Sequence, residues 1–369
     1  MRIAQIAPLQ VAVPPKAYGG TERVVHNLTE ALVRLGHDVT LFAAGDSRTS
    51  ARLVPMVERA INFDSTVDIT ALHVAELAEV YRQADDFDII HSHLEHLTLP
   101  FAAQVRTPTI LTLHGRLDDP VSTNVYHNSA NCHYVSISQS QRRYLPNLNW
   151  VATVHHGVAI DDFPYYPNPG TYLAFVGRIA PEKGPDRAIE IAIRSGIPLK
   201  IAAKVDPIDR AYFQAVIEPM LDHPLVEFLG EVDEAGKREV MGNALALLLP
   251  ITWPEPFGMV FIESLACGTP ILTCPYGSVP ELLCDGVTGY ARNTIGACVE
   301  ATKALPYISR AGCRAYAKAR FDTRRMALAY VNAYAKVRGQ KMPFAESELP
   351  IATTAVEATG EYTAATRVS

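Results

Sequence analysis

Short apolar runs alternate with amphipathic stretches along most of this chain, and this alternation limits its fold more than any other feature of the sequence. Runs typical of buried strands include IAQIA at 3–7, DIIHSH at 88–93, LAFVG at 173–177 and ALALLLP at 244–250, and helical spacing of apolar residues follows most of them. Alternating strands and helices are typical of a parallel sheet with right-handed crossovers. We therefore expect an α/β protein.

The alternation is interrupted once, in the segment AIDDFPYYPNPG at 159–170, which carries three prolines. A chain of 369 residues, 48% of them hydrophobic, can fill two cores. We expect two Rossmann-like domains facing each other across a cleft, with residues 1–160 in the first, 161–170 as a linker and 171–322 in the second. The Thr-, Ala- and Glu-rich segment 344–369 lacks periodicity and is expected to be disordered.

Composition excludes several classes of protein. The net charge is −6 with acids and bases mixed along the chain, which argues against a nucleic-acid partner. No apolar run approaches the roughly 18 residues of a membrane span, and the first residues read as a strand without a signal peptide. The six cysteines form no CxxC pair, which fits buried thiols in a reducing compartment. We expect a cytoplasmic protein with no strong membrane signal, and its oligomeric state is left open.

The segment EPFGMVFIE places two glutamates, Glu255 and Glu263, eight positions apart after a buried run and a turn, PITWP, that contains two prolines and a tryptophan. Glu255 is expected in a loop at the carboxyl end of a strand, where open α/β sheets bind ligands. Glu263 is expected two turns into the following helix. The backbone N–H groups of Phe257, Gly258 and Met259 would lie at the helix N-terminus and could donate to anions or hydroxyls. Two carboxylates beside such donors suit a polyhydroxylated, phosphate-bearing ligand.

Several motifs together resemble retaining glycosyltransferases of family 4, the group 1 glycosyltransferases. TYLAFVGRIAPEKG and PEPFGMVFIESLACGTPILTCPYGSVPELLCDGVTGY resemble the donor-binding half of these enzymes. GGTERVVHNLTEALVRLGHDVTLFA, FDIIHSH, LTLHG, YVSISQSQ and HHGVAIDDF resemble the acceptor-side half, in order. The resemblance covers residues 1 to about 338 and implies the GT-B fold. It also implies that a carboxyl-terminal helix at 323–340 crosses back onto the first domain.

The resemblance implies roles for two pairs of residues that contact the phosphates. Arg178 and Lys183 would neutralise the departing nucleoside diphosphate, because two cations at this spacing can clamp its charge. Gly19 and Gly20 would let backbone amides approach the diphosphate, with Thr21 as the N-cap of the next helix.

The remaining implied contacts are with the sugar and the nucleoside. Glu263 would accept hydrogen bonds from the ribose hydroxyls, Glu255 would contact the donor sugar, and His114 would touch the reacting sugar. Val260 joins Phe257, Gly258 and Met259 in the donor-binding segment. The residues predicted to be catalytic are thus His114, Arg178, Lys183 and Glu255.

The implied activity is retaining, metal-independent transfer of a hexose-type sugar from a UDP- or GDP-linked donor to a hydroxyl acceptor, with no cofactor required. The stretch 69–88 is acidic on balance, and the first half carries no strongly basic amphipathic helix. This pattern favours a soluble saccharide or small metabolite as acceptor over a lipid.

Three further patterns are weighed against this interpretation. Asp86-Phe87-Asp88 resembles a metal-binding DxD motif but precedes its strand, so we expect no metal site there. His91 and His93 point to one face of a strand without a third ligand, and a structural or cleft-lining role is favoured. Lys204, after the next strand, is a candidate phosphate contact.

Three other functions remain open on the sequence alone. A sugar-nucleotide 2-epimerase shares the fold and would turn over donor without acceptor. A two-lobed binding protein is disfavoured by the absence of a signal peptide. A regulator that binds nucleotide-sugar without catalysis would retain Glu263 but show no turnover.

Overall fold

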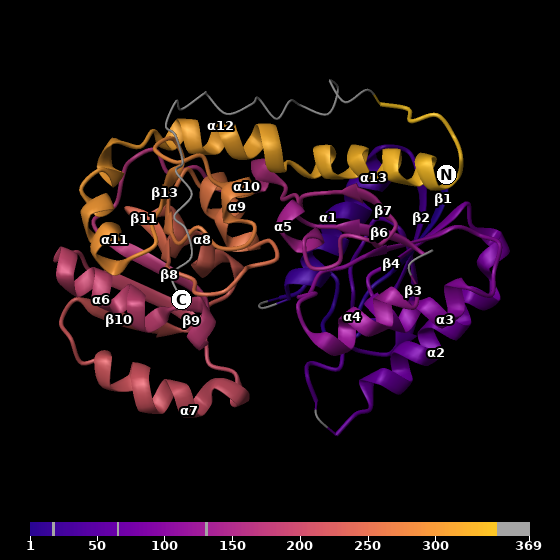
Figure 1. Ribbon diagram of the computed structural model, residues 1–369, viewed down its shortest axis with the longest axis horizontal. Helices are drawn as coiled ribbons and strands as arrows, with labels where there is room; N and C mark the ends of the chain where they lie inside the picture. The colour runs from indigo at the N-terminus through magenta and orange to yellow at the C-terminus, as the bar shows by residue number, and fades with distance from the viewer. Residues whose placement is uncertain (17–18, 65, 130–131, 345–369) are drawn as a thin grey trace, which may run out of the picture.

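The computed structural model describes residues 1–16, 19–64, 66–129 and 132–344. Within these residues the chain forms two parallel sheets, each in its own lobe (Figure 1). The first sheet consists of β1 Arg2–Ile6, β2 Asp38–Ala44, β3 Arg52–Val57, β4 Ile89–Ser92, β5 Thr109–Thr112, β6 His133–Ser136 and β7 Trp150–Thr153. The second consists of β8 Leu173–Arg178, β9 Leu199–Lys204, β10 Val226–Gly230, β11 Ala246–Leu249, β12 Ile271–Thr273 and β13 Gly289–Ala291.

The strand order is β3-β2-β1-β4-β5-β6-β7 in the first sheet and β10-β9-β8-β11-β12-β13 in the second, with parallel pairing throughout. Each order reverses direction once, between β1 and β4 and between β8 and β11. Open α/β sheets bind ligands at such switch points, beyond the carboxyl ends of the strands. The fold is thus a pair of Rossmann-like units, and the α/β fold expected from the sequence is confirmed.

Helices cover both sheets. Their bounds are α1 Gly20–Arg34, α2 Ile69–Arg82, α3 Leu99–Ala102, α4 Pro120–His127, α5 Gln139–Arg142, α6 Pro185–Ser195, α7 Arg210–Tyr212, α8 Glu234–Gly242, α9 Met259–Ala266, α10 Val279–Leu282, α11 Ile295–Thr302, α12 Arg310–Phe321 and α13 Thr323–Val337. No helix within the described residues is long and apolar enough to cross a membrane.

Two expected elements differ from the structure. The N-cap of α1 is Gly19, without a side-chain hydrogen bond, so the prediction of Thr21 as the cap is wrong. A Cβ at Gly19 would lie 2.7 Å from Cβ of Pro15, which explains a glycine at this turn. The sequence analysis did not predict strand β3, because β3 is a half-exposed edge strand that contains Pro55.

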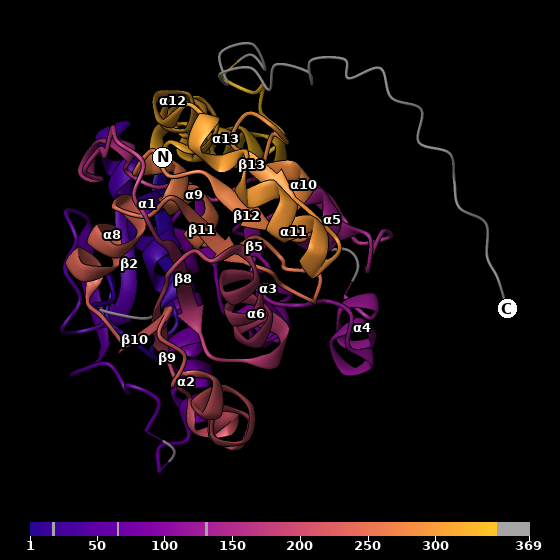
Figure 2. The same ribbon diagram turned by 90° about the vertical axis from the view of Figure 1, so that its left-hand side faces the viewer.

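The last two helices join the lobes. Helix α12 lies against α9 of the second lobe, whereas α13 lies along α1 and β7 of the first (Figures 1 and 2). Met326, Tyr330 and Tyr334 of α13 are buried in the core that contains Ile3 and Leu28. The segment 323–337 therefore contributes core residues to the amino-terminal lobe.

The segment 159–170 is fastened to the second lobe. The Arg314 guanidinium of α12 donates to the carbonyl oxygens of Ile160 and Phe163, and Tyr166 N–H donates to the carbonyl of Cys267. The expected disordered segment 344–369 lies outside the described residues except for Phe344, whose backbone exchanges hydrogen bonds with the Asn332 side chain.

Candidate active site

A cavity of about 450 Å³ lies between the lobes, at the carboxyl ends of both sheets. The sequence-predicted residues that line it are Gly19, Gly20, His114, Arg178, Lys183, Glu255, Phe257, Gly258, Met259, Val260 and Glu263. The structure therefore brings together every residue predicted to contact the donor. Their individual roles stay predictions.

The glycine loop after β1 leaves space toward the cavity. A Cβ built on Gly20 would meet no atom of the described residues within 4 Å, so these residues do not require glycine at this position. Gly20 also begins α1, where backbone N–H groups and the helix dipole favour an anion. The empty space in front of Gly20 is thus available to a ligand.

Arg178 is the last residue of β8, Lys183 follows it, and both are held by carboxylates. Arg178 Nη2 donates to Glu182 Oε1 at 2.7 Å, and its other nitrogens lie 3.3 Å from Asp209 and 3.7 Å from Asp206. These acids fix the guanidinium at the rim of the cavity.

Lys183 Nζ donates to Glu255 Oε2 and lies 4.8 Å from the centroid of the Trp253 ring. Glu255 is only 7% exposed, so this ion pair is largely removed from water. The pair compensates the cost of burying the carboxylate.

The loop that carries Glu255 is held in place by the segment that follows β12. Ser278 N–H donates to the Glu255 carbonyl at 2.9 Å, and Ser278 Oγ donates to the Phe257 carbonyl at 2.7 Å. Gly277 has φ +63, and a Cβ there would come within 2.3 Å of the Glu255 backbone nitrogen. A turn of small residues therefore packs directly against the loop that carries Glu255. The sequence analysis did not assign this role to Gly277 and Ser278.

Glu263 lies on α9, 3% exposed, and accepts a hydrogen bond from Lys237 Nζ at 3.0 Å. Burial by itself raises the pKa of Glu263, but the charges of Lys237 and Arg23 outweigh it and hold that pKa below its usual value. Glu263 is therefore an ionised acceptor that faces the cavity.

Arg23 of α1 reaches across the cleft to this group, and the sequence interpretation missed it. Its Nη2 donates to Glu234 Oε1 at 2.7 Å, and Lys237 donates to the same oxygen at 2.9 Å. The resulting chain runs from Arg23 through Glu234 and Lys237 to Glu263. A basic residue one turn after a predicted phosphate loop is the signal that would have identified Arg23.

Besides Arg23 and Arg116, the first lobe supplies histidines to the cavity. His114, just after β5, lines the cavity and stacks on His156 with 5.2 Å between the ring centroids. His93 Nδ1 lies 2.8 Å from His114 Nε2. Burial lowers the pKa of His114 to about 3 and the pKa of His93 and His156 well below the usual value. These three histidines are therefore neutral at physiological pH.

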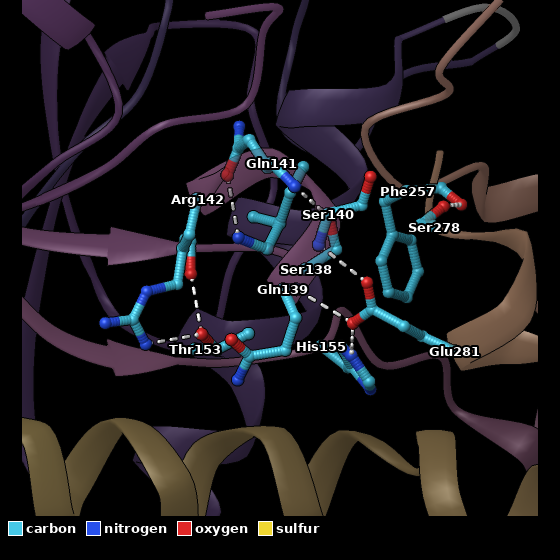
Figure 3. Close-up of polar contacts among 12 residues, drawn as sticks. Ser138, Gln139, Ser140, Gln141, Arg142, Thr153, His155, Phe257, Ser278 and Glu281 are labelled. Carbon is cyan, nitrogen blue, oxygen red and sulfur yellow. Dashed lines mark hydrogen bonds and ion pairs between the residues drawn. The ribbon is translucent and has the colours of Figure 1, made fainter. Parts of the chain in front are cut away.

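Beside the cavity, a second set of contacts ties the lobes together (Figure 3). Glu281 of α10 accepts hydrogen bonds from the backbone N–H groups of Gln139 and Ser140, both at 2.8 Å, and lies 3.0 Å from His155 Nε2. Ser138 Oγ donates to the Pro256 carbonyl at 2.7 Å. Burial by itself raises the pKa of Glu281, but the hydrogen bonds from His155, Gln139 and Ser140 have the larger effect and hold that pKa below its usual value. Glu281 therefore remains ionised.

The remaining candidates from the sequence lie in different places. Asp86 and Asp88 lie at the amino end of β4, on the edge of the sheet opposite the cavity, and Asp88 pairs with Arg2. Lys204 lines the cavity and pairs with Asp206 at 2.8 Å. Arg238 of α8 donates to the Asp162 carbonyl at 2.8 Å.

Known proteins define the class to which this fold and cavity belong. Residues 18–162 match the family model for Glycosyltransferase Family 4, and residues 166–294 match the model for Glycosyl transferases group 1. These two adjoining matches cover most of the chain. The chain belongs to the family 4 (group 1) glycosyltransferases.

Individual relatives agree with this membership. Glycogen synthase of Mycobacterium tuberculosis is 25% identical over 92% of this chain and 96% of the relative. Sucrose-phosphate synthase from Thermosynechococcus elongatus has a TM-score of 0.75, 18% identity and coverage of 92% and 99% of the two chains. Anabaena HepE in complex with UDP and glucose has a TM-score of 0.70, 19% identity and coverage of 91% and 100%. The protein is a glycosyltransferase that uses a nucleotide-sugar donor.

Proposed function

We propose that this enzyme transfers a hexose-type sugar from a UDP- or GDP-linked donor to a hydroxyl of a soluble saccharide or small metabolite, with retention of anomeric configuration and without a metal or cofactor. The observation that carries the proposal is the cavity itself. It places two cations, an ionised ribose-binding candidate and the open Gly20 loop around one volume.

The diphosphate is expected to bind between the Gly20 loop and the two cations. Breaking the anomeric bond develops negative charge on the leaving phosphate, and preorganised cations stabilise that charge. Lys183 pairs with Glu255, so donor binding would exchange this contact for phosphate and release Glu255 to accept hydrogen bonds from the donor sugar. The positive charge of Arg178 and Lys183 replaces the charge that a divalent ion supplies in metal-dependent transferases.

Retention is supported by the distribution of carboxylates. The acidic residues that line the cavity, Glu182, Glu231, Glu234, Glu255 and Glu263, all come from the second lobe. Among the described residues, the first lobe therefore presents no carboxylate to the cavity that could act as a base on the opposite face of the sugar. His114 is also a weak base, because burial lowers its pKa to about 3. The departing phosphate is then the base that takes the proton of the acceptor.

The acceptor side supports a soluble substrate. Helices α1, α2 and α4 of the first lobe carry few basic residues, and α2 contains two glutamates against one arginine. An enzyme that docks on an anionic membrane is expected to show a basic amphipathic helix instead.

A panel of UDP-, GDP- and ADP-sugars tests the proposal by thermal shift and by release of nucleoside diphosphate, with and without saccharide acceptors and with and without EDTA. A ligand at 100 times its Kd stabilises the folded state by about 2.7 kcal/mol. We expect this shift in the wild type, its loss in Glu263→Ala, and its retention in Glu227→Ala, which alters an exposed pair with Lys200.

Several outcomes would contradict parts of the proposal. No shift in the wild type with any sugar nucleotide would overturn the nucleotide-donor assignment, and an equal shift in Glu263→Ala would overturn the ribose assignment. Turnover of donor without acceptor would indicate an epimerase. Inactivation by EDTA would overturn metal independence. A product whose anomeric proton coupling shows the configuration opposite to that of the donor would overturn retention.

A further inference from the structure

A continuous chain of hydrogen bonds runs from His114 at the cavity through His93 and Gln5 to Tyr334 of α13, and His91 joins it at Gln5. His114 Nε2 lies 2.8 Å from His93 Nδ1, and His93 Nε2 lies 3.0 Å from Gln5 Oε1. The Gln5 amide nitrogen donates to the Tyr334 hydroxyl at 3.2 Å and lies 3.3 Å from His91 Nδ1. Because each ring nitrogen of a neutral histidine either donates or accepts, the orientation of the Gln5 amide determines where the protons of this chain lie.

The proton positions follow from elementary hydrogen-bond chemistry. The carbonyl oxygen of Gln5 can only accept, so His93 must carry its proton on Nε2. A neutral His93 then has a bare Nδ1, which accepts from His114, so the proton of His114 lies on Nε2. Burial lowers the pKa of both rings, and both are neutral near pH 7.

The opposite orientation of the Gln5 amide would reverse every proton in the chain. His91, His93 and His114 would then all carry the proton on Nδ1. The orientation in the structure gives all three the Nε2–H form, which is the more stable tautomer of an isolated histidine side chain. It also directs the Gln5 amide nitrogen toward the Tyr334 hydroxyl, which can accept.

The arrangement leaves one nitrogen of His114 for a ligand. Nδ1 of His114 makes no hydrogen bond to any of the residues that the structure describes, and the side chain lines the cavity. We propose that His93 is a positioning residue which, together with Gln5, fixes the tautomer of His114 so that Nδ1 faces the bound sugar as a hydrogen-bond acceptor. The statement about the sugar rests on the function proposed above, whereas the tautomer of His114 does not.

The consequence is a rule of substrate specificity. A hydroxyl that donates a hydrogen bond to His114 is recognised, and a group at the same place that can only accept, such as fluorine or a carboxylate, faces a lone pair. A neutral hydrogen bond contributes about 0.5–1.5 kcal/mol. Replacing the hydroxyl should thus weaken binding by roughly three- to tenfold.

Nitrogen NMR of the protein labelled with ¹⁵N-histidine tests the tautomer without substrate. We expect His114, assigned by its absence from the spectrum of His114→Asn, to show a protonated Nε2 and a bare Nδ1 at their limiting chemical shifts at pH 7. A protonated Nδ1 at pH 7, alone or together with Nε2, would overturn the proposal.

Two substitutions of nearly equal shape test the role of His93. The amide oxygen of His93→Asn takes the place of Nδ1 and still accepts from His114, whereas His93→Leu offers no acceptor. We expect limiting shifts for His114 in the Asn variant and shifts averaged between tautomers in the Leu variant. Unchanged limiting shifts in a folded His93→Leu would show that His93 does not set the tautomer.

Fluorinated donors test the specificity rule. With the nucleotide sugar found by the panel above, each sugar hydroxyl is replaced in turn by fluorine, and binding is measured by calorimetry. We expect one position to lose affinity by roughly three- to tenfold in the wild type but not in His114→Ala. If fluorine is tolerated at every position, or if the loss persists in His114→Ala, the sugar does not donate to His114.

Discussion

The two lobes line opposite walls of the cavity, and the polar groups of these walls are stabilised in different ways. The wall from the second lobe is ionic and pairs each cation with acids, as in Lys183 with Glu255 and Lys237 with Glu263. The wall from the first lobe consists largely of neutral groups, among them His114, which hydrogen-bonds to His93 and stacks on His156. Charged groups are therefore concentrated where a diphosphate would bind, and neutral groups where a sugar would bind.

The ionic wall should give the largest effect on catalysis. Lys183→Ala removes a cation from the phosphate site and leaves the buried Glu255 without its partner. We expect kcat to fall by about 10²–10³, the usual loss when one preorganised donor to a developing charge is removed. Steady-state kinetics measure the change, and Lys200→Ala, which alters a pair between β9 and the edge strand β10, serves as the control. A loss below tenfold would show that the phosphate charge is stabilised elsewhere.

The neutral wall should make stability depend on pH in a defined direction. His114 has a pKa of about 3 in the folded state, below its unfolded value of 6.5, so the unfolded state binds more protons in acid. Stability is therefore complete above pH 6.5 and decreases as the pH falls toward the folded pKa. At pH 5 this histidine should lower the free energy of unfolding by about 2 kcal/mol relative to pH 7.

Denaturant unfolding of the wild type and His114→Asn between pH 5 and 8 measures this effect. The variant should lose less stability than the wild type on acidification, whereas His127→Asn, at an exposed position on α4, should follow the wild type. Parallel curves for the wild type and His114→Asn would mean that His114 is not kept neutral by the fold.

Arg23 departs from this comparison, because it carries a charge of the first lobe into the ionic wall. Arg23→Gln breaks the contact with Glu234, and Lys237 is then free to move toward Glu234 and away from Glu263. We expect the KM for the donor to rise by roughly three- to tenfold with little change in kcat. This rise corresponds to a loss of about 1 kcal/mol of binding free energy that is the same in the ground state and the transition state. Arg34→Gln, an exposed change on the same helix, is the control. A drop in kcat without a change in KM would place Arg23 in the chemical step instead.

The sequence predicted the ionic wall better than the neutral one. The ionic wall comes from short motifs that each follow the end of one strand, and these motifs contain Arg178, Lys183, Glu255 and Glu263. The sequence around each residue was therefore enough to predict its place at the cavity. The histidine network depends on Gln5, His93, His114 and Tyr334, which come from four separate elements. Their contacts arise only when strands β1, β4 and β5 pair and α13 returns to the first lobe.

Strand β3 and the contact of Arg23 were missed for a related reason. The β3 segment is half exposed and contains Pro55, so its apolar pattern is weak. Arg23 reads as a solvated residue on an amphipathic helix, and its partner Glu234 belongs to the other lobe. Contacts across a cleft leave no periodic signal in either segment.

The most direct test of the account is a crystal structure with a nucleoside diphosphate bound. We predict that the diphosphate contacts Arg178 and Lys183 in front of Gly20, that the ribose hydroxyls donate to Glu263, and that Lys183 has left Glu255. A diphosphate bound elsewhere, or an intact Lys183–Glu255 pair beside the bound nucleotide, would contradict the assignment of the ionic wall as the donor site.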